Sequence, residues 1–447
     1  MVRHTRRTFL KVSGSLLGGV AVGSTVTAAE SAERFLVDTK RGSAGRLERS
    51  DLAVVHDLPE VDLAVVEGSE SALADSKFDY APDTTYELDL PVDDAPVEAE
   101  ESATDEPLYP LQWDKHVQGV PDVHETTRGE GTRVAIVDTG VAAGHPDLAH
   151  AVDEDRSRDF TGDGYGSGGP YGGYHGTHVA GIVAASDENE AGVVGTAPGT
   201  EIVDCRVFSQ TGSASFADMM AALVYSARIE CDAVNMSIGA YPVSRAGLGS
   251  FYGKVLNRTT TYANRQGTLL VVSAGNDAAD LQHDGPVVSL PNEAAQALSV
   301  SATGPIGFQW GEEGLEDGPR SPAYYTNYGT NAVDLAAPGG DVDLEAAAED
   351  EVPWYYDLVL NTVAEPEFSD DGEYLGAIYD YNWVAGTSMA APQVAGAVAL
   401  VKSVAPDLNA NQVESVLERT ADVPDGYDKT YYGSGFLNPL AAVEDVE

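Results

Sequence analysis

Residues 133–140 read RVAIVDTG, a continuous apolar run that stops at an aspartate and a glycine turn. Other short apolar runs of the same form lie further along the chain, at 201–203, 232–236 and 268–272. Windows with helical character lie between the runs, at 178–185, 216–230 and 251–265. Strands buried on both faces read as continuous apolar runs, so this alternation with helices predicts an α/β fold with a doubly wound parallel sheet.

Polar residues gather where these runs end, which is where ligands bind in such sheets. Asp138 ends the first run, and Asn276 ends the SAGN turn at 273–276 that follows the run 268–272. Taken singly, each has an ordinary explanation, because a strand-end aspartate can cap a helix and an asparagine is a common turn residue.

Two further motifs place reactive side chains at expected helix starts. His175 opens HGTHVAG at 175–181, and Ser388 lies inside GTSMAAP at 386–392. A zinc site at His175 and His178 is the alternative for the first motif, but no third ligand is evident. Ser388 can be a simple N-cap, although its small neighbours leave space for a substrate and the helix start offers an N–H to an oxyanion.

Together, the chain order Asp138, His175, Ser388 and the full motifs around each residue resemble the subtilisin-like serine proteases, or subtilases. The resemblance runs from about residue 112 to 439. It implies a subtilisin-like fold in which Ser388 attacks the scissile carbonyl, His175 carries the proton and Asp138 supports the imidazolium. It also implies that Asn276 and the Ser388 N–H hold the oxyanion.

The same resemblance indicates how protein and peptide substrates bind. An extended substrate is expected to add by backbone hydrogen bonds beside Ser237, Ile238 and Gly239. Gly212 and Ser213 are expected to line the opposite edge. Ala240 follows where a second glycine is frequent in the family, so the sequence leaves subsite preference open.

A structural calcium ion is a further implication of the resemblance. Gln112, Asp147 and the loop 186–189, with Asp187 and Asn189 as its ligands, stand where subtilases often hold Ca²⁺. Their hard oxygen atoms suit this ion. The loop is about one residue longer than usual, which leaves Glu188 as an alternative ligand.

The N-terminal residues carry an export signal. Residues 5–11, TRRTFLK, resemble a twin-arginine motif, a short apolar stretch follows, and 26–28 offers small residues for cleavage. We therefore expect a signal peptide over 1–29 and a secreted protein without a membrane anchor. The alternative is a basic start to a cytosolic protein.

The composition divides the remainder of the chain. Residues 30–92 contain three strand-like runs, at 34–37, 51–55 and 63–66, and are expected to be a small α+β propeptide that inhibits the enzyme. A permanent accessory domain is the alternative. Residues 93–106 are predicted to be an acidic linker with the processing site, and 107–447 a monomeric catalytic domain.

The charge of the 447-residue chain is strongly negative. Asp and Glu number 72 against 25 Lys and Arg, which gives a formal net charge of −47. Nucleic acid is therefore excluded as a partner, and anionic membranes are disfavoured. Concentrated salt screens the self-repulsion of such a surface, so we expect a halophilic, halolysin-like protein rather than merely a soluble acidic one.

Three questions stay open at the level of sequence. Cys205 and Cys231 can be a disulfide or two buried thiols. The stretches 307–320 and 341–380 look inserted, with no assigned role. A peptide ligase or cyclase on the same fold and a catalytically silent surface-binding module are the rivals of a hydrolase.

Overall fold

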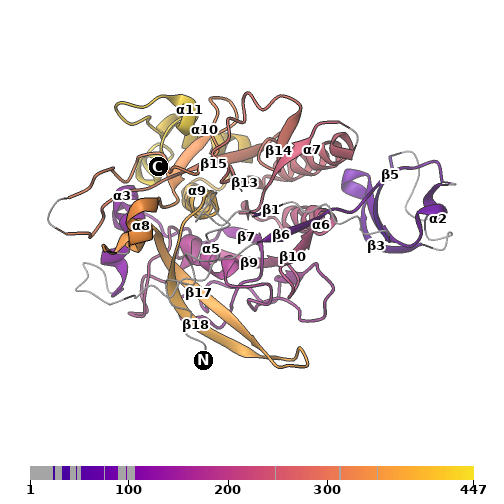
Figure 1. Ribbon diagram of the computed structural model, residues 1–447, viewed down its shortest axis with the longest axis horizontal. Coiled ribbons are helices and arrows are strands. Elements are labelled where there is room, and N and C mark those ends of the chain that lie inside the picture. Colours follow the sequence, from indigo (N-terminus) through magenta and orange to yellow (C-terminus); the bar gives the residue numbers. More distant parts are fainter. Residues whose placement is uncertain are drawn as a thin grey trace.

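The computed structural model describes residues 24–25, 33–40, 47, 52–74, 76–88, 97, 106–246, 248–311, 314–349 and 351–447. The twin-arginine motif, the expected cleavage residues 26–28 and nearly all of the linker 93–106 lie outside the described residues. Figure 1 shows a large body with a small N-terminal sheet at one side.

A seven-stranded parallel sheet forms the centre of the large body, in the order β16-β15-β13-β11-β7-β9-β8. Its strands are β7 (Arg133–Asp138), β8 (Arg158–Asp159), β9 (Glu201–Arg206), β11 (Ala233–Met236), β13 (Leu269–Ser273), β15 (Ala297–Thr303) and β16 (Leu335–Pro338). All four predicted apolar runs lie in this sheet, so the doubly wound α/β prediction is confirmed.

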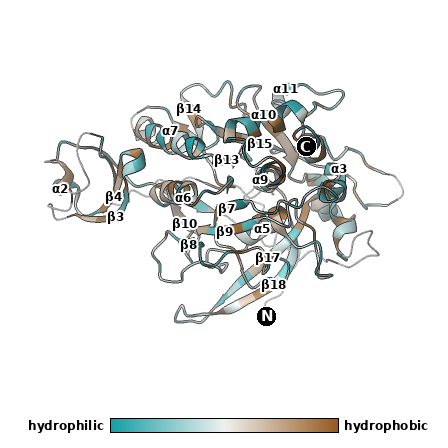
Figure 2. Cartoon of the chain, turned by 180° about the vertical axis from the view of Figure 1, so that it is seen from behind, coloured by the Kyte–Doolittle hydropathy of each residue, from teal (hydrophilic) through white to brown (hydrophobic). Residues whose placement is uncertain are grey.

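Helices cover both faces of the sheet. The four long ones nearest to it are α5 (His175–Ala184), α6 (Phe216–Arg228), α7 (Leu248–Gln266) and α9 (Thr387–Val404). Alternate residues of β7 enter two different cores: Val134 and Ile136 join the core of α5 and α9, whereas Ala135 and Val137 join the core of α6 and α7. Figure 2 shows α9 brown at the centre of the body, where this helix is buried.

Shorter elements complete the large body. They are η3 (Tyr109–Leu111), α3 (Trp113–Gln118), α4 (Val120–His124), β10 (Ser213–Ser215), β12 (Ala240–Ser244), β14 (Val287–Leu290), α10 (Ala410–Thr420), α11 (Lys429–Tyr432) and α12 (Pro439–Glu444). Among the described residues, no helix combines the length and the apolar character needed to cross a membrane.

The N-terminal unit is a four-stranded antiparallel sheet in the order β3-β4-β2-β5. It consists of β2 (Arg34–Asp38), β3 (Ala53–Leu58), η2 (Pro59–Val61), β4 (Leu63–Glu67), α2 (Glu70–Ala74) and β5 (Asp79–Pro82). Each of the three predicted runs is a strand of this sheet. Its apolar side chains Leu36, Leu63 and Val65 share a core with α6 and α7, so the unit is docked on these helices (Figure 1).

One inserted stretch, 341–380, folds into α8 (Leu344–Glu349), η4 (Trp354–Asp357) and a long hairpin of β17 (Val359–Phe368) and β18 (Tyr374–Val384). The hairpin packs on α5, where the Thr362 hydroxyl donates to the Thr177 carbonyl at 2.9 Å. Gly181 permits this approach, because a Cβ there would lie 2.1 Å from Asn361 Oδ1. The insertion thus supports the helix that begins with His175.

Both cysteines are free, buried thiols. Cys205 lies on β9 and its Sγ is 3.6 Å from the Ser226 hydroxyl. Burial raises the pKa of the Cys205 thiol to about 12, so this group is protonated at neutral pH.

Candidate active site

Asp138 and His175 form a buried pair at the carboxyl end of β7. His175 Nδ1 lies 2.8 Å from Asp138 Oδ1, and both side chains are fully buried. Asp138 Oδ1 also accepts from the Thr139 N–H at 2.7 Å, which fixes the carboxylate. His175 Nε2 is buried with no hydrogen-bond partner among the described residues, so this nitrogen is available to accept a proton.

Ser388 is the second residue of α9 and is 4% exposed. Its hydroxyl donates to the Ser237 carbonyl at 3.3 Å, while the Ser237 hydroxyl donates to the Ser388 carbonyl at 2.8 Å. This exchange ties the start of α9 to the segment after β11. Catalytic hydrogen bonds are often loose without substrate, and here the serine hydroxyl makes one long hydrogen bond to a backbone carbonyl.

Asn276 lies beside the start of α9 because Thr387 holds its side-chain oxygen. Asn276 Oδ1 accepts from the Thr387 N–H at 2.9 Å and from the Thr387 hydroxyl at 2.8 Å. The opposite end of the amide, Nδ2, faces Gly386, where a Cβ would lie 3.5 Å away. The amide N–H₂ is thereby aimed at the space next to Ser388, where a donor can meet an oxyanion.

Two positioning threonines went unnoticed in the sequence analysis. Thr387 holds Asn276 and also accepts from the Gly275 N–H at 3.0 Å. The Thr139 hydroxyl donates to the Gly173 carbonyl at 2.9 Å and accepts from the Gly176 N–H at 2.8 Å, which fixes the start of α5. The only sequence signal is that each threonine is adjacent to a candidate catalytic residue, Ser388 or Asp138.

His178 does not pair with His175 to hold a metal ion. Its Nε2 lies 3.2 Å from the Asn382 carbonyl and 3.3 Å from that of Val359, both on the hairpin. Burial, together with nearby His175, lowers the pKa of His178 to about 3. The ring is therefore a neutral packing group between α5 and the hairpin.

Strand β6 (Thr85–Leu88) lies beside β10, the strand that begins with Ser213, one of the residues predicted to bind substrate. Strand β6 pairs antiparallel with β10, with Glu87 opposite Ser213 and Tyr86 opposite Ala214. The short β1 (Ser24–Thr25) pairs with the other edge of β6. Ser213 thus belongs to an edge that pairs with an extended chain, whereas Gly212 lies in the turn before it, where its N–H donates to the Ser209 carbonyl at 2.9 Å.

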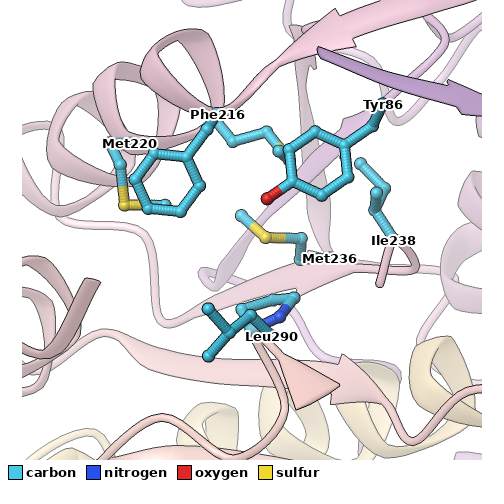
Figure 3. A pocket seen from close by; sticks show the side chains of 8 residues that line it. Tyr86, Phe216, Met220, Met236, Ile238 and Leu290 are labelled. Carbon is cyan, nitrogen blue, oxygen red and sulfur yellow. The ribbon is translucent and has the colours of Figure 1, made fainter. Parts of the chain in front are cut away.

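The Tyr86 side chain, which is 5% exposed, lines a small apolar pocket beside this edge. Figure 3 shows the ring reaching from β6 toward Phe216 and Met236. Ile238, one of the predicted substrate-binding residues, lines the same pocket with Leu290. Ser237 contacts Ser388, so the segment 237–239 joins the pocket to the candidate nucleophile.

The side chains predicted to bind calcium accept hydrogen bonds from protein groups. Asp147 accepts from Asn189 Nδ2 at 2.9 Å through Oδ1, and from the Val193 N–H at 3.1 Å through Oδ2. Gln112 Oε1 accepts from the Val194 N–H at 2.7 Å.

The remaining two predicted ligands are engaged in the same way. Asp187 Oδ2 accepts from Arg128 Nε at 2.6 Å, and Asn189 Oδ1 accepts from the Ala191 N–H at 3.0 Å. Asp147 and Asn189 thus contact each other and Gln112 binds the same loop, whereas Asp187 pairs with Arg128. The oxygen donors of Gln112, Asp147 and Asn189 have the chemistry that suits calcium, and calcium binding here stays a prediction.

Comparisons with known proteins agree with this geometry. The sequence model described as the subtilase family matches residues 129–435. The extracellular protease of Xanthomonas campestris pv. campestris is 32% identical over 350 residues, which cover 70% of this chain and 51% of that protein. The present chain thus spans about half the length of that relative.

Two further proteins, one compared by sequence and one by structure, are also similar to this chain. The halolysin of Haloferax mediterranei is 29% identical over 432 residues, covering 95% of this chain and 69% of the halolysin. A protease of Pseudoalteromonas arctica PAMC 21717 has a TM-score of 0.60 at 26% identity, covering 77% of this chain and 100% of that one. The family match extends over more than half of the chain and includes Asp138, His175, Asn276 and Ser388: the protein belongs to the subtilase family.

Proposed function

We propose that this subtilase is a serine endopeptidase that hydrolyses peptide bonds through an acyl-enzyme on Ser388. The observation that carries the proposal is the buried Asp138–His175 pair, in which His175 Nε2 has no hydrogen-bond partner among the described residues. It lies with Ser388 and Asn276 at the ends of the central strands, where the fold binds ligands.

The proposed acylation step uses four groups. Ser388 Oγ leaves the Ser237 carbonyl, attacks the scissile carbonyl carbon and passes its proton to His175 Nε2. Asp138 accepts from His175 Nδ1 and stabilises the imidazolium. The Ser388 N–H and the Asn276 amide donate to the oxyanion, which forms only in the tetrahedral state.

Collapse of this intermediate breaks the C–N bond, and the imidazolium gives its proton to the leaving amine. Water then attacks the acyl carbon, with His175 again accepting a proton. Ser388 regains its hydrogen from the imidazolium when the acid product leaves. An extended substrate would pair with Ser213 as β6 does and place an apolar side chain near Ile238.

The N-terminal unit is proposed to be an inhibitory propeptide rather than a permanent accessory domain. What supports this role is β6, which continues from the unit and occupies the edge expected to bind substrate. Charged contacts reinforce docking: Arg34 pairs with Asp218 on α6, and His56 Nε2 lies 2.9 Å from the same carboxylate. Arg34 Nε is also 3.2 Å from Asp83 Oδ2, within the unit.

Secretion and adaptation to high salt complete the proposal. Relatives named extracellular protease and halolysin support export, and the twin-arginine motif supplies a route. A net charge of −47 favours a compact state only where salt screens the repulsion. We propose a monomer, because the same charge opposes self-association.

The test compares wild type with Ser388→Ala at roughly 3 M and 0.1 M NaCl, conditions that differ strongly in screening. Casein hydrolysis and labelling by a fluorophosphonate probe are measured for both proteins. We expect hydrolysis and labelling only in wild type and only at high salt.

Each departure from this pattern has a distinct meaning. Labelling without hydrolysis indicates a narrow processing protease or a ligase, and product analysis with a single peptide separates the two. Full activity in dilute buffer removes the halophilic part of the proposal. Without labelling at either salt, after loss of residues 30–92 has been verified, the proposed activity is wrong.

A further inference from the structure

Glu106, the last residue of the predicted linker, has a fully buried side chain in the loop that was expected to bind calcium. Its Oε1 accepts from the N–H groups of Asn189 and Glu190, at 2.9 and 3.0 Å. Its Oε2 accepts from the N–H groups of Ala191 and Gly192, at 3.0 and 2.9 Å. Four successive backbone donors therefore converge on one carboxylate.

The direction of these peptide groups decides which charge the loop can hold. Successive N–H groups that point into one concavity form a nest for an anion, because each presents the positive end of its dipole. Hydrogen bonds to an ionised acceptor are stronger than neutral ones. A cation placed in this nest would meet four positive dipole ends, so the loop is organised around an anion.

The same loop connects distant parts of the catalytic domain. The Leu108 N–H donates to the Gly192 carbonyl at 2.9 Å, and the Val193 N–H donates to Asp147. The Tyr381 ring of the hairpin covers Gly192, where a Cβ would lie 2.2 Å from the ring. Fixing the loop therefore joins the start of the domain, the segment after β7 and the inserted hairpin.

We propose that the Glu106 carboxylate is the internal anion that fixes this loop, named here as residues 186–193, in the mature enzyme. Because Glu106 must stay attached, processing cuts the chain before this residue, a consequence that rests on the proposed propeptide.

The test uses the full chain with Ser388→Ala, which prevents self-digestion, at constant high salt. Glu106→Gln keeps the shape of the side chain but replaces one acceptor with a donor that faces backbone N–H groups. We expect its melting temperature to fall by about 2–4 °C in a chain of this length. The matched control is Glu190→Gln, which removes an exposed charge from the same loop and should leave the melting temperature unchanged.

Hydrogen exchange reports on the loop directly, at a temperature where circular dichroism shows that the parent and both variants are folded. Exchange at 189–192 should be slow in the parent and in Glu190→Gln, and faster in Glu106→Gln. Equal stability and equal exchange of the two variants would overturn the proposal.

The N-terminus of the active enzyme gives a further check. A mature chain that begins at or before Glu106 supports the proposal. A fully stable mature chain that begins after Glu106 contradicts it. Because self-processing needs the proposed activity, the melting temperatures of the Ser388→Ala variants above are the readout whose outcome is separate from that activity.

Discussion

The direction of the Asn276 amide is set by a single neighbouring side chain, that of Thr387. Thr387 satisfies Asn276 Oδ1 twice, so the amide cannot turn over without losing both hydrogen bonds. The donor is thus positioned before substrate arrives, which is what makes an oxyanion contact effective.

The first prediction ranks this donor against the nucleophile. Asn276→Ala should lower kcat about 10²–10³-fold with little change in KM, because the contact is made mainly in the transition state. Ser388→Ala should lower kcat on the order of 10⁶-fold. Steady-state kinetics on one peptide substrate measures both, and equal losses would contradict the assigned roles.

At the scale of elements, β6 links the N-terminal unit to the cleft. The strand pairs with β10 and alternates its side chains, so Tyr86 packs in the core shared with Phe216 and Ile238 while Glu87 faces solvent. Docking thus combines backbone hydrogen bonds, which many sequences could form, with one buried aromatic side chain.

The second prediction concerns inhibition by this unit. Tyr86→Ala in an added fragment 30–92 should raise its inhibition constant for mature enzyme about 10–100-fold, since a buried aromatic contact is lost. Glu87→Gln is the matched control and should inhibit like the unchanged fragment. If both variants inhibit equally well, Tyr86 does not direct the docking.

At the scale of the whole molecule, several carboxyl groups of this acidic chain are buried inside the protein. Burial raises the pKa of Asp204, Asp341 and Asp357 to about 7 each, against smaller opposing effects of hydrogen bonds from backbone N–H groups. Each group therefore binds its proton more tightly in the folded state than in the unfolded chain.

The third prediction follows from the sign of these shifts. Between about pH 4 and pH 7 the folded state holds more protons than the unfolded state, so stability falls as pH rises through this window and then levels off. The melting temperature of Ser388→Ala should be lower at pH 8 than at pH 5 in the same salt. A hydrogen bond from Arg206 helps to lower the pKa of Asp163. The stability that Asp163 contributes is therefore lost only at more acidic pH.

Asp204→Asn isolates one of these groups. The amide oxygen can still accept from the Gly168 N–H, which donates to Asp204 at 2.8 Å. The variant should therefore show a smaller drop between pH 5 and pH 8 than its parent. Identical pH slopes for the two proteins would show that Asp204 does not titrate in this range.

Much of the fold and of the candidate site could be predicted from sequence because the signals are local. A strand buried on both faces must be apolar throughout, so β7, β9, β11 and β13 are visible as short runs. Each of the four candidate catalytic residues lies in a motif of a few residues, whose small glycines and alanines let neighbouring segments pack closely; the residues are Asp138, His175, Asn276 and Ser388.

Tertiary structure alone decided what depends on distant groups or on backbone direction. The Thr387–Asn276 contact and the entry of β6 beside β10 join residues more than a hundred positions apart. The role of Glu106 was not visible in the sequence for a different reason: side-chain composition does not reveal whether nearby peptide groups present N–H or C=O. Here φ and ψ turn four N–H groups toward Glu106, and that direction, rather than composition, determines the charge that the loop holds.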